Sequence, residues 1–391
     1  MLYLAPVFCI FEPMSPEPLH ILQTCFSPSW GGLELQALEV SRRLIGRSHA
    51  VWLACQGGSK LESEARNAGV PVVPLGVSGY FHPGAVLALA RFLRRERIDI
   101  IHAQHSKDLA TVVPAKIASG RKCPLLLSKR VGSYLMKRDL LHRFTYAHVD
   151  RVLAISEVIR INVAETTPVP PDRIVTLHDA VDLDQFSPSA AHRERVRAEF
   201  GCGSATVVVG FIGRFSPGKG HEEFLSAAAL LAPAHPELRF VIVGEASRGE
   251  EPYERVVRER CEELNLGPVV RFTGFRKDVP DVLSAFDIFA FPSHAEAFGV
   301  VLIEAMAMER PVVSTNCDGV LDIVVDGETG IFVHPRNAAE LAAALGTLAL
   351  DPAMRRSMGL AGRKRAEALF DQRKQTDAII LAYRELLGRS A

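Results

Sequence analysis

Short apolar runs alternate with longer segments of helical pattern along this chain, and that alternation constrains the fold more than any other feature. In the first half, apolar runs of strand length cover residues 20–26, 50–55, 70–75, 99–103, 124–128, 151–155 and 173–177. In the second half they cover 206–212, 238–243, 269–273, 287–291, 311–314 and 330–333. Helical patterns lie between them, for example over 34–45, 83–95 and 157–165. Apolar strands that alternate with helices favour parallel sheets covered on both faces.

Two such series in one chain predict an α/β fold with two Rossmann-like β/α/β domains. A length of 391 residues allows two to three domains, and 48% apolar residues suffice for cores of normal size. Asp, Ser, Pro and Ala collect around residues 182–192 before a new strand, so we place the linker there. The predicted boundaries are 17–190 for an N-terminal domain, 191–371 for a C-terminal domain and 372–391 for a terminal helical segment.

The first residues do not fit either domain. Residues 1–13 are apolar, but they are too short to span a bilayer and lack the basic region of a signal peptide. We therefore expect residues 1–16 to be disordered or loosely attached, with Met14 as an alternative start to Met1.

Charge and cysteine content exclude several classes of protein. The formal net charge is zero, with 45 basic and 45 acidic residues, which argues against a general nucleic-acid binder. The seven cysteines are scattered singly, so neither a zinc site nor a disulfide framework is indicated. A reducing cytoplasm suits this pattern best.

The segment 291–315 carries the most specific chemical pattern. Glu296 and Glu304 bracket seven residues, and apolar runs precede and follow them. Residues 300–308 contain no Gly or Pro and are strong helix formers. Phe298 and Gly299 then lie at the helix start, where free N–H groups and the helix dipole can hold a phosphate. A carboxylate further along can accept hydrogen bonds from a sugar diol, so the segment predicts a nucleotide site.

The first loop of the second half adds two cations. Gly213, Gly218 and Gly220 allow a ligand to approach the backbone closely. Arg214 and Lys219 suit a diphosphate group. The loop is close to a Walker A motif, but Gly220 stands where that motif needs Ser or Thr, which disfavours a P-loop NTPase.

Together these motifs resemble the retaining GT-B glycosyltransferases of family 4, the glycosyl transferases group 1. The resemblance covers about residues 19–390 and is strongest over 206–335. It implies two Rossmann-like domains that face each other across a cleft. The N-terminal domain would lie on the acceptor side, and the C-terminal domain would bind a nucleotide sugar. It also implies that the terminal helix, over 372–387, packs back on the N-terminal domain.

The resemblance assigns roles to individual residues. Arg214 and Lys219 would bind the diphosphate and Glu304 the ribose, while Glu296 would contact the donor sugar or support the pocket. His105 or His102 would contact the sugar from the N-terminal domain. The donor-binding candidates are Gly31, Gly32, Gly213, Arg214, Lys219, Gly274, Phe275, Arg276, Glu296, Phe298, Gly299 and Glu304. The catalytic candidates are His105, His102, Arg214, Lys219 and Glu296. His105 is favoured over His102 because His102 alternates with apolar residues in a strand. A solvated loop position explains Arg276 equally well.

Three positions depart from the family pattern. His178 to Asp182 replace the usual N-G-x-D, Arg310 replaces a Gly, and Asp322 replaces a Glu. The first and third leave donor contacts near residues 316–321 open.

A basic stretch follows the fifth predicted strand. Its cations are Lys129, Arg130, Lys137, Arg138 and Arg143, and apolar residues such as Tyr134 and Leu140 are interleaved with them. Either this is a solvated face, or it is a patch for an anionic acceptor or a membrane surface.

The resemblance implies transfer of a sugar from a UDP- or GDP-linked donor to a hydroxyl of a glycan or glycolipid, with lipopolysaccharide or cell-surface polysaccharide synthesis as the setting. We expect no metal and no other cofactor, and a cytoplasmic protein with peripheral contact to the inner membrane surface. Two alternatives stay open: a sugar-nucleotide epimerase of the same architecture, and a non-catalytic transferase-like partner subunit.

Overall fold

The computed structural model describes residues 17–77, 82–247 and 249–389. The expectation for residues 1–16 therefore lies outside the described residues. Contacts divide the chain into two compact units. Of the described residues, the first unit comprises those within 17–127, His148–Asp150 and Leu386–Arg389, and the second comprises Ser128–Ala147 and those within 151–385. The domain boundaries at residues 190 and 371 stay predictions.

One sheet has seven strands in the order β3-β2-β1-β4-β5-β6-β7. These are β1 (His20–Cys25), β2 (Ala50–Gln56), β3 (Val72–Leu75), β4 (Ile100–Ala103), β5 (Leu125–Lys129), β6 (Arg151–Ala154) and β7 (Ile174–Thr176). The pairs β1–β2, β1–β4, β2–β3, β4–β5 and β6–β7 are parallel. Strands β4 and β5 are buried along their whole length, as their apolar sequences predict.

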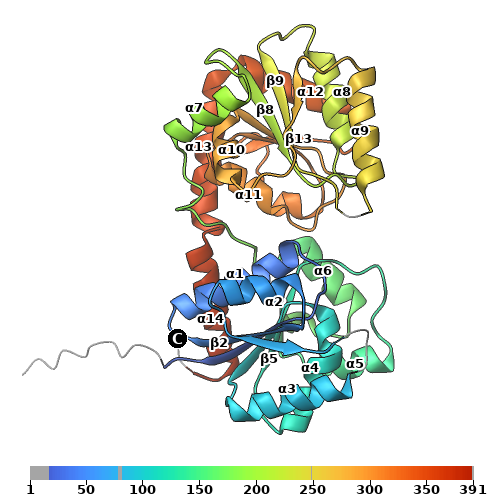
Figure 1. Ribbon diagram of the computed structural model, residues 1–391, viewed down its shortest axis with the longest axis vertical. Helices are drawn as coiled ribbons and strands as arrows, with labels where there is room; N and C mark the ends of the chain where they lie inside the picture. The colour runs from blue at the N-terminus through green and yellow to red at the C-terminus, as the bar shows by residue number, and fades with distance from the viewer. Residues whose placement is uncertain (1–16, 78–81, 248, 390–391) are drawn as a thin grey trace, which may run out of the picture. The chain divides into compact units, whose positions relative to one another are not determined.

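Helices connect these strands (Figure 1). They are α1 (Gly32–Gly46), α2 (Lys60–Asn67), α3 (Pro83–Arg95), α4 (Leu109–Ser119), α5 (Leu140–Ala147) and α6 (Glu157–Thr166), with 3-10 turns at Ser106–Asp108 and Pro171–Arg173. Serine side chains cap two of them: Ser59 accepts from the Glu62 amide at the start of α2, and Ser156 accepts from the Ile159 amide at the start of α6.

The other sheet has six strands in the order β10-β9-β8-β11-β12-β13, and every neighbouring pair is parallel. Its strands are β8 (Val207–Ile212), β9 (Leu238–Val243), β10 (Val270–Phe272), β11 (Ile288–Phe291), β12 (Val312–Thr315) and β13 (Gly330–Val333). Its helices are α7 (Ala190–Glu199), α8 (His221–Leu231), α9 (Glu251–Glu263), α10 (Val279–Ala285), α11 (Val300–Ala307), α12 (Ala338–Leu350) and α13 (Pro352–Leu369), with a 3-10 turn at Asp318–Asp322.

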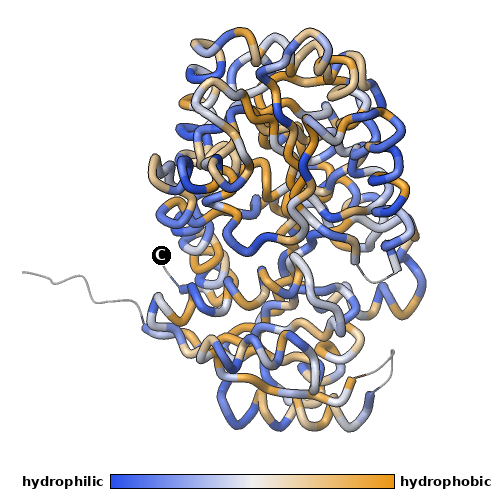
Figure 2. Tube along the Cα trace, turned by 45° about the horizontal axis from the view of Figure 1, so that its top comes forward, coloured by the Kyte–Doolittle hydropathy of each residue, from blue (hydrophilic) through white to orange (hydrophobic). Residues whose placement is uncertain are grey.

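Apolar side chains from α8, α9, α12 and α13 form one core cluster with β8, β9 and β11, while α7 and α10 lie on the opposite side of this sheet (Figure 1). The strands run through the interior as hydrophobic segments (Figure 2). Every strand and helix predicted from the sequence ends within two residues of its observed bounds. The central strands β4, β5, β11 and β12 are buried along their whole length, so local pattern and tertiary environment agree there.

The last helix, α14 (Gln372–Leu386), contacts residues that precede the predicted linker. Gln375 Nε2 donates to the carbonyl of His178 at 2.6 Å, and Arg151 Nη1 pairs with Glu385 Oε2 at 2.5 Å. Across the described residues, no helix combines the length and apolar content needed to cross a bilayer.

Arg310, one of the three departures from the family pattern, has a structural role. It lies near the amino ends of β11 and β12. Its guanidinium donates to the carbonyls of Met308 and Phe286 at 2.7 Å each. Burial lowers its pKa to about 10. The side chain therefore satisfies carbonyl groups that a glycine would leave to water.

The loop between β8 and α8 depends on two glycines in the left-handed region. Gly218 has φ +85° and Gly220 has φ +84°. A Cβ atom on Gly220 would lie 2.1 Å from the carbonyl oxygen of Pro292, whereas one on Gly218 would meet nothing closer than His294 Nδ1 at 3.9 Å. Close packing of this loop on the segment after β11 therefore requires glycine at position 220 in particular.

The two glycines form a matched pair of variants. Alanine at either position costs about 1–2 kcal/mol of backbone strain. Only Gly220→Ala also pushes a methyl group into a backbone carbonyl, so we expect it to lower the free energy of unfolding by about 1–3 kcal/mol more than Gly218→Ala. Urea unfolding followed by circular dichroism compares them, and equal losses would contradict the packing described.

Candidate active site

The candidate site lies where the order of the six-stranded sheet reverses. Strand β8 is followed in sequence by β9 on one side, while β11 pairs on its other side. In open parallel sheets, ligands bind outside the carboxyl ends of the strands at such a switch point. The loops after β8 and β11, which carry the predicted cations and the first glutamate, both leave the sheet at this edge.

An ion pair joins these two loops. Lys219 Nζ lies 2.5 Å from Glu296 Oε2, and the two side chains are 28% and 19% exposed. The amide of His294 also donates to the carbonyl of Gly218 at 2.8 Å. The structure thus brings together two predicted site residues that are 77 positions apart in sequence.

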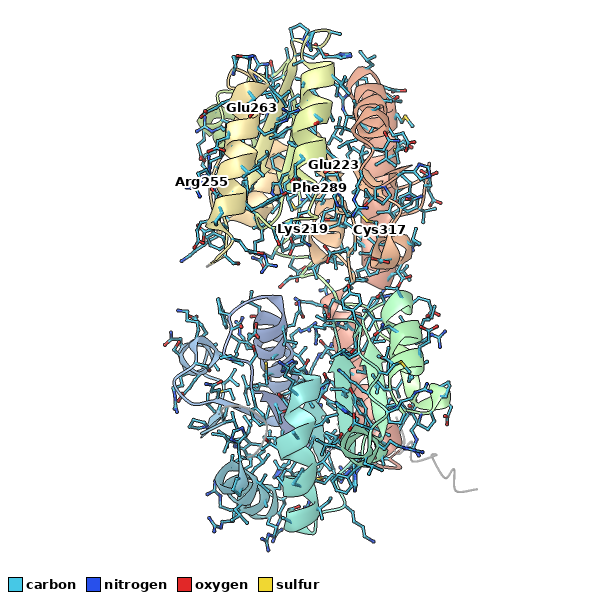
Figure 3. The ribbon with its side chains drawn as sticks, turned by 90° about the vertical axis from the view of Figure 1, so that its right-hand side faces the viewer. Lys219, Glu223, Arg255, Glu263, Phe289 and Cys317 are labelled. Carbon is cyan, nitrogen blue, oxygen red and sulfur yellow. The ribbon has the colours of Figure 1, made fainter. Side chains whose placement is uncertain are left out.

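A second contact supports the same junction. A ring nitrogen of His294, Nε2, lies 2.9 Å from Glu223 Oε1, which is in the first turn of α8. Figure 3 shows Lys219 in the loop before α8, Glu223 within that helix, and Cys317 at the same end of the sheet. Sequence reasoning missed His294 and Glu223; the only signal was their proximity to the predicted motifs.

His221, the first residue of α8, adds no charge to this region. It is fully buried between the rings of Phe211 and Phe215, each with its centroid 4.5 Å away. Burial lowers its pKa to about 3, so the imidazole is neutral at ordinary pH. Its aromatic packing fixes the start of α8, directly after Lys219 and Gly220.

Arg214 is the more accessible of the two predicted cations. Its side chain is 56% exposed, and Nε lies 3.3 Å from Glu250 Oε2. Ser216 Oγ donates to the other oxygen of Glu250 at 2.7 Å. Because exposed ion pairs are weak, an anionic ligand can compete for Arg214 at little cost.

The loop that carries Glu296 is held from two sides. The Glu296 amide donates to Asp318 Oδ2 at 3.2 Å, and the Glu296 carbonyl accepts from the Gly319 amide at 3.0 Å. Ser156 Oγ donates to the carbonyl of Ala297 at 2.6 Å. A Cβ atom on Gly319 would lie 2.2 Å from that same carbonyl oxygen, so no side chain fits there.

Phe298 and Gly299 complete the turn into α11. The Phe298 ring is 2% exposed and stacks on His178 with centroids 5.5 Å apart. Only its backbone is therefore a candidate for ligand binding. Gly299 caps the helix with φ +101°, a conformation that favours glycine. His178, one of the departures from the family pattern, thus packs under the predicted phosphate site.

Glu304 differs from the other charged groups of the site. Its side chain lies in α11 and is only partly exposed. No side chain in the described part of the chain forms a hydrogen bond or ion pair with its carboxylate. Burial without a partner raises its pKa to about 7. A carboxyl group in this state has all its hydrogen-bonding capacity left for a ligand.

The backbone at Gly274 and Phe275, two of the donor-binding candidates, lies next to the loop after β8. The Gly244 amide donates to the carbonyl of Gly274 at 3.0 Å, and a Cβ atom on Gly244 would lie 1.9 Å from the Gly213 carbonyl oxygen. Three loop segments therefore meet at this edge with little side-chain material between them. Phe275 is 61% exposed, so its ring is accessible.

Arg276, in contrast, is occupied within the protein. Its Nη2 lies 2.7 Å from Asp278 Oδ2, and Nη1 pairs with Glu199. Hydrogen bonds to these two carboxylates raise its pKa above the usual range. The charge of Arg276 is thus balanced by Asp278 and Glu199 within the protein, which is a structural role.

The two predicted histidines lie in the first unit and differ in environment. His102 is fully buried, with Nδ1 3.4 Å from Gln23 Nε2 and Nε2 3.3 Å from Gln104 Nε2. The side chain of His105 is 29% exposed, and its Nδ1 lies 3.6 Å from Asp108 Oδ1. Asp108 is itself buried, and burial raises its pKa. Of the two histidines, only His105 is accessible to a ligand.

A pocket of about 630 Å³ lies beside His105. It is lined by Phe26, Ser27, Pro28, Ser29, Gln56, Val77, His82, His105, Lys107, Asp108 and Thr111. Gly31 and Gly32 lie at the start of α1, and Gly31 takes an extended conformation with φ −169°. The first unit therefore has its own concave, polar surface at the carboxyl ends of its strands.

The predicted cationic patch needs a correction. Lys129 is 7% exposed, and burial with the nearby Lys137 ammonium lowers its pKa to about 8. The Arg130 side chain is 9% exposed and pairs with Asp179 at 3.0 Å. The prediction of an exposed patch was therefore wrong for these two residues: Lys129 is the last residue of the buried strand β5, and Arg130 directly follows it. Lys137, Arg138 and Arg143 lie further along and are partly or fully exposed.

Among residues 17–77, 82–247 and 249–389, no group of three or more His, Cys, Asp or Glu side chains is arranged to hold a metal ion.

Comparison with known proteins matches most of the chain to two families. Residues 30–185 match Glycosyltransferase Family 4, and residues 192–365 match Glycosyl transferases group 1. The D-inositol 3-phosphate glycosyltransferase of Saccharomonospora viridis is 31% identical over 318 residues, which cover 80% of this chain and 70% of that protein. The alpha-D-kanosaminyltransferase of Streptomyces kanamyceticus is 26% identical over 84% of this chain and 90% of its own length. The match to the D-inositol 3-phosphate glycosyltransferase of Corynebacterium jeikeium is shorter: 37% identity over 212 residues, which cover 52% of this chain and 50% of that protein.

Solved structures show the same fold. A glycosyltransferase from Rickettsia africae aligns with a TM-score of 0.85 at 22% identity, over 95% of this chain and all of its own. The Anabaena protein HepE, in complex with UDP and glucose, aligns with a TM-score of 0.80 at 23% identity, over 93% of this chain and 99% of its own. The α/β fold with two Rossmann-like parallel-sheet domains is thus the GT-B architecture, and this chain belongs to the family 4, or group 1, glycosyltransferases.

Proposed function

We propose that this glycosyltransferase takes its sugar from a UDP-linked donor, with a GDP-linked donor as the second candidate, and transfers it with retention to a hydroxyl of a glycan or glycolipid. The observation that carries the proposal is the Lys219–Glu296 pair at the sheet switch point, with the unpaired Glu304 in the helix that follows. The complex of HepE with UDP and glucose supports UDP as the first base to test.

Two cations stabilise the leaving group in this proposal. As the bond to the sugar breaks, negative charge grows on the terminal phosphate of the nucleotide. Arg214 and Lys219 supply fixed positive charge there, which is usually the largest contribution to catalysis. An ammonium group has three donors, so Lys219 can hold Glu296 and a phosphate oxygen together. The backbone amides at the start of α11 add further donors.

In this proposal, Glu296 and Glu304 bind the other two parts of the donor, its sugar and its ribose. Held by Lys219, Glu296 keeps a free oxygen with which to accept a hydrogen bond from a hydroxyl of the donor sugar. Glu304 accepts from the ribose diol and binds it best as the ionised carboxylate, which is the stronger acceptor. His105, the accessible one of the two predicted histidines, is the candidate for contact with the transferred sugar.

Membership of the family indicates the general class of the acceptor and not its identity. The named relatives transfer to inositol phosphate or act as a kanosaminyltransferase. We propose a cell-surface glycan or glycolipid, including lipopolysaccharide, as the acceptor class, with the reaction at the cytoplasmic membrane face. An epimerase would turn over the donor without any acceptor, and a non-catalytic subunit would not release UDP at all.

Nucleotide binding tests the donor site. We expect UDP to bind equally well with magnesium and with EDTA, because Arg214 and Lys219 provide the positive charge. Lys219→Ala and Glu304→Ala should each weaken binding by about 10- to 100-fold, as expected for loss of one or two charge-assisted hydrogen bonds. Isothermal titration calorimetry with UDP, GDP and ADP measures this.

The matched control for this titration is Arg260→Ala, which removes a surface cation of α9 that pairs with Glu263. It should bind as the wild type does. Strict dependence on magnesium, or affinity that is indifferent to both site variants, would overturn the proposed donor site.

The pKa of Glu304 predicts how stability depends on pH. The folded pKa of about 7 lies above the unfolded value of 4.5, so the folded state holds more protons between these pH values. The free energy of unfolding therefore falls as pH rises through this window, and the cost is fully present above pH 7. Glu304→Gln removes the cost, so its stability relative to the wild type should rise by about 1–3 kcal/mol between pH 4.5 and pH 8.

Urea unfolding at several pH values measures that difference. Glu263→Gln, at a surface position of α9 that is 64% exposed, is the control and should show a small difference that does not vary in this way. A Glu304→Gln difference that is constant from pH 4.5 to pH 8 would show that the carboxyl is not perturbed.

A further inference from the structure

Residues 131–144, here called the surface segment, expose large apolar side chains close together. The exposed fractions are 66% for Val131, 104% for Tyr134, 75% for Leu135, 61% for Met136, 86% for Leu140, 61% for Leu141 and 47% for Phe144. Single exposed apolar residues are common, but a group of this size marks an interaction surface.

The second half of the surface segment forms one face of α5. Leu140, Leu141 and Phe144 are spaced so that they lie on the same side of the helix. On the other side, Thr145 and Tyr146 are buried. The helix therefore has a buried face that anchors it and an apolar face that is exposed.

Polar contacts hold the first half in place. The Ser133 amide donates to Asn162 Oδ1 at 2.7 Å, and Asn162 Nδ2 donates back to the Ser133 carbonyl at 3.0 Å. The Lys137 amide donates to the carbonyl of Thr166 at 2.7 Å, and Arg138 donates to the carbonyl of Glu165 at 2.9 Å. All of these partners belong to α6, so the segment presents its apolar side chains from a fixed backbone.

The charges of the surface segment favour an anionic partner. It contains three cations, Lys137, Arg138 and Arg143, against a single carboxylate, Asp139. Asp139 is in addition paired with His142. Apolar side chains interleaved with cations suit the boundary between anionic headgroups and acyl chains. A second copy of the same surface is a poor partner, because a symmetric contact would bring two sets of cations together.

The surface segment also borders the candidate active site. A pocket of about 310 Å³ has Val131, Gly132, Ser133 and Tyr134 along one side. The remaining lining residues are Val158, Ile159, Asn162, Ala295, Glu296, Ala297 and Asp318. The residues that expose apolar groups to the outside thus continue into the pocket that contains Glu296.

We infer that the surface segment docks this enzyme on an anionic lipid bilayer. The docked orientation places the pocket beside Glu296 at the bilayer surface, where the head group of a glycolipid can enter while its lipid stays in the membrane. The choice of a glycolipid as acceptor rests on the proposed function; the docking itself does not.

Co-sedimentation with lipid vesicles tests the docking. The full chain is mixed with vesicles of phosphatidylcholine alone or of phosphatidylcholine with phosphatidylglycerol. We expect binding to the anionic vesicles to be at least about tenfold tighter, and to weaken at high salt because charge pairing is screened. The triple variant Leu140→Ser, Leu141→Ser, Phe144→Ser should lose about tenfold or more, because three apolar side chains no longer enter the bilayer.

A second triple variant controls for general loss of surface hydrophobicity. Leu230→Ser, Val256→Ser and Leu350→Ser remove apolar side chains that are 59%, 54% and 70% exposed on α8, α9 and α12. This variant should bind vesicles as the wild type does. Arg143→Glu, which reverses an exposed charge, should weaken binding to anionic vesicles alone.

The UDP affinity of each variant shows whether the variant is still folded, so a loss of vesicle binding can be assigned to docking. Both triple variants should keep the wild-type affinity for UDP. Docking is overturned if the wild type ignores anionic vesicles, or if the first triple variant binds them as well as the wild type does. It is also overturned if sedimentation velocity shows a dimer, lost in that variant, without vesicle binding. Absence of UDP binding in the wild type would instead overturn the proposed donor site and leave the vesicle result standing.

Discussion

The site depends on the junction between the loop after β8 and the loop after β11. Lys219 and Glu296 form an ion pair across this junction, and a backbone hydrogen bond from His294 to Gly218 closes it. Neither contact forms unless the backbones come close, which is why position 220 accepts only glycine. A partly buried pair of this kind is sensitive to position, because its strength depends on short distance and on limited access of water.

The charged side chains of the scaffold differ from those of the candidate site in whether they are paired within the protein. Arg130, Arg276 and Arg310 satisfy carboxylates or backbone carbonyls within the protein. Arg214 is exposed and only weakly paired, while Glu304 is partly buried and has no side-chain partner within the described residues. Burying an acid without a hydrogen bond is costly, so evolution tolerates it mainly where a ligand supplies the missing contact. In this family the ligand is a nucleotide sugar, and the two groups suit its diphosphate and its ribose.

The apolar side chains of residues 131–144 fit the same logic at the surface. A soluble enzyme gains nothing from exposing Tyr134, Leu135 and Leu140, and a fixed backbone prevents them from folding inwards. Their position beside the pocket with Glu296 puts the proposed docking surface next to the proposed sugar site. An acceptor that is half lipid and half sugar needs an apolar surface next to a pocket with polar groups, and Ser133, Asn162, Glu296 and Asp318 supply polar groups to this pocket.

The sequence by itself determined the order and type of the secondary structure elements, the two-domain α/β class and the motifs at residues 213–220 and 296–304. These features rest on local pattern, on helix and strand propensity, and on spacing within one loop or one turn. Only the tertiary structure decided which charges have partners. Arg130 pairs with a residue 49 positions away, and Lys219 with one 77 positions away. Burial and pairing arise from contacts between distant segments, so they correct the patch at Lys129 and Arg130 and leave Glu304 without a side-chain partner among the described residues.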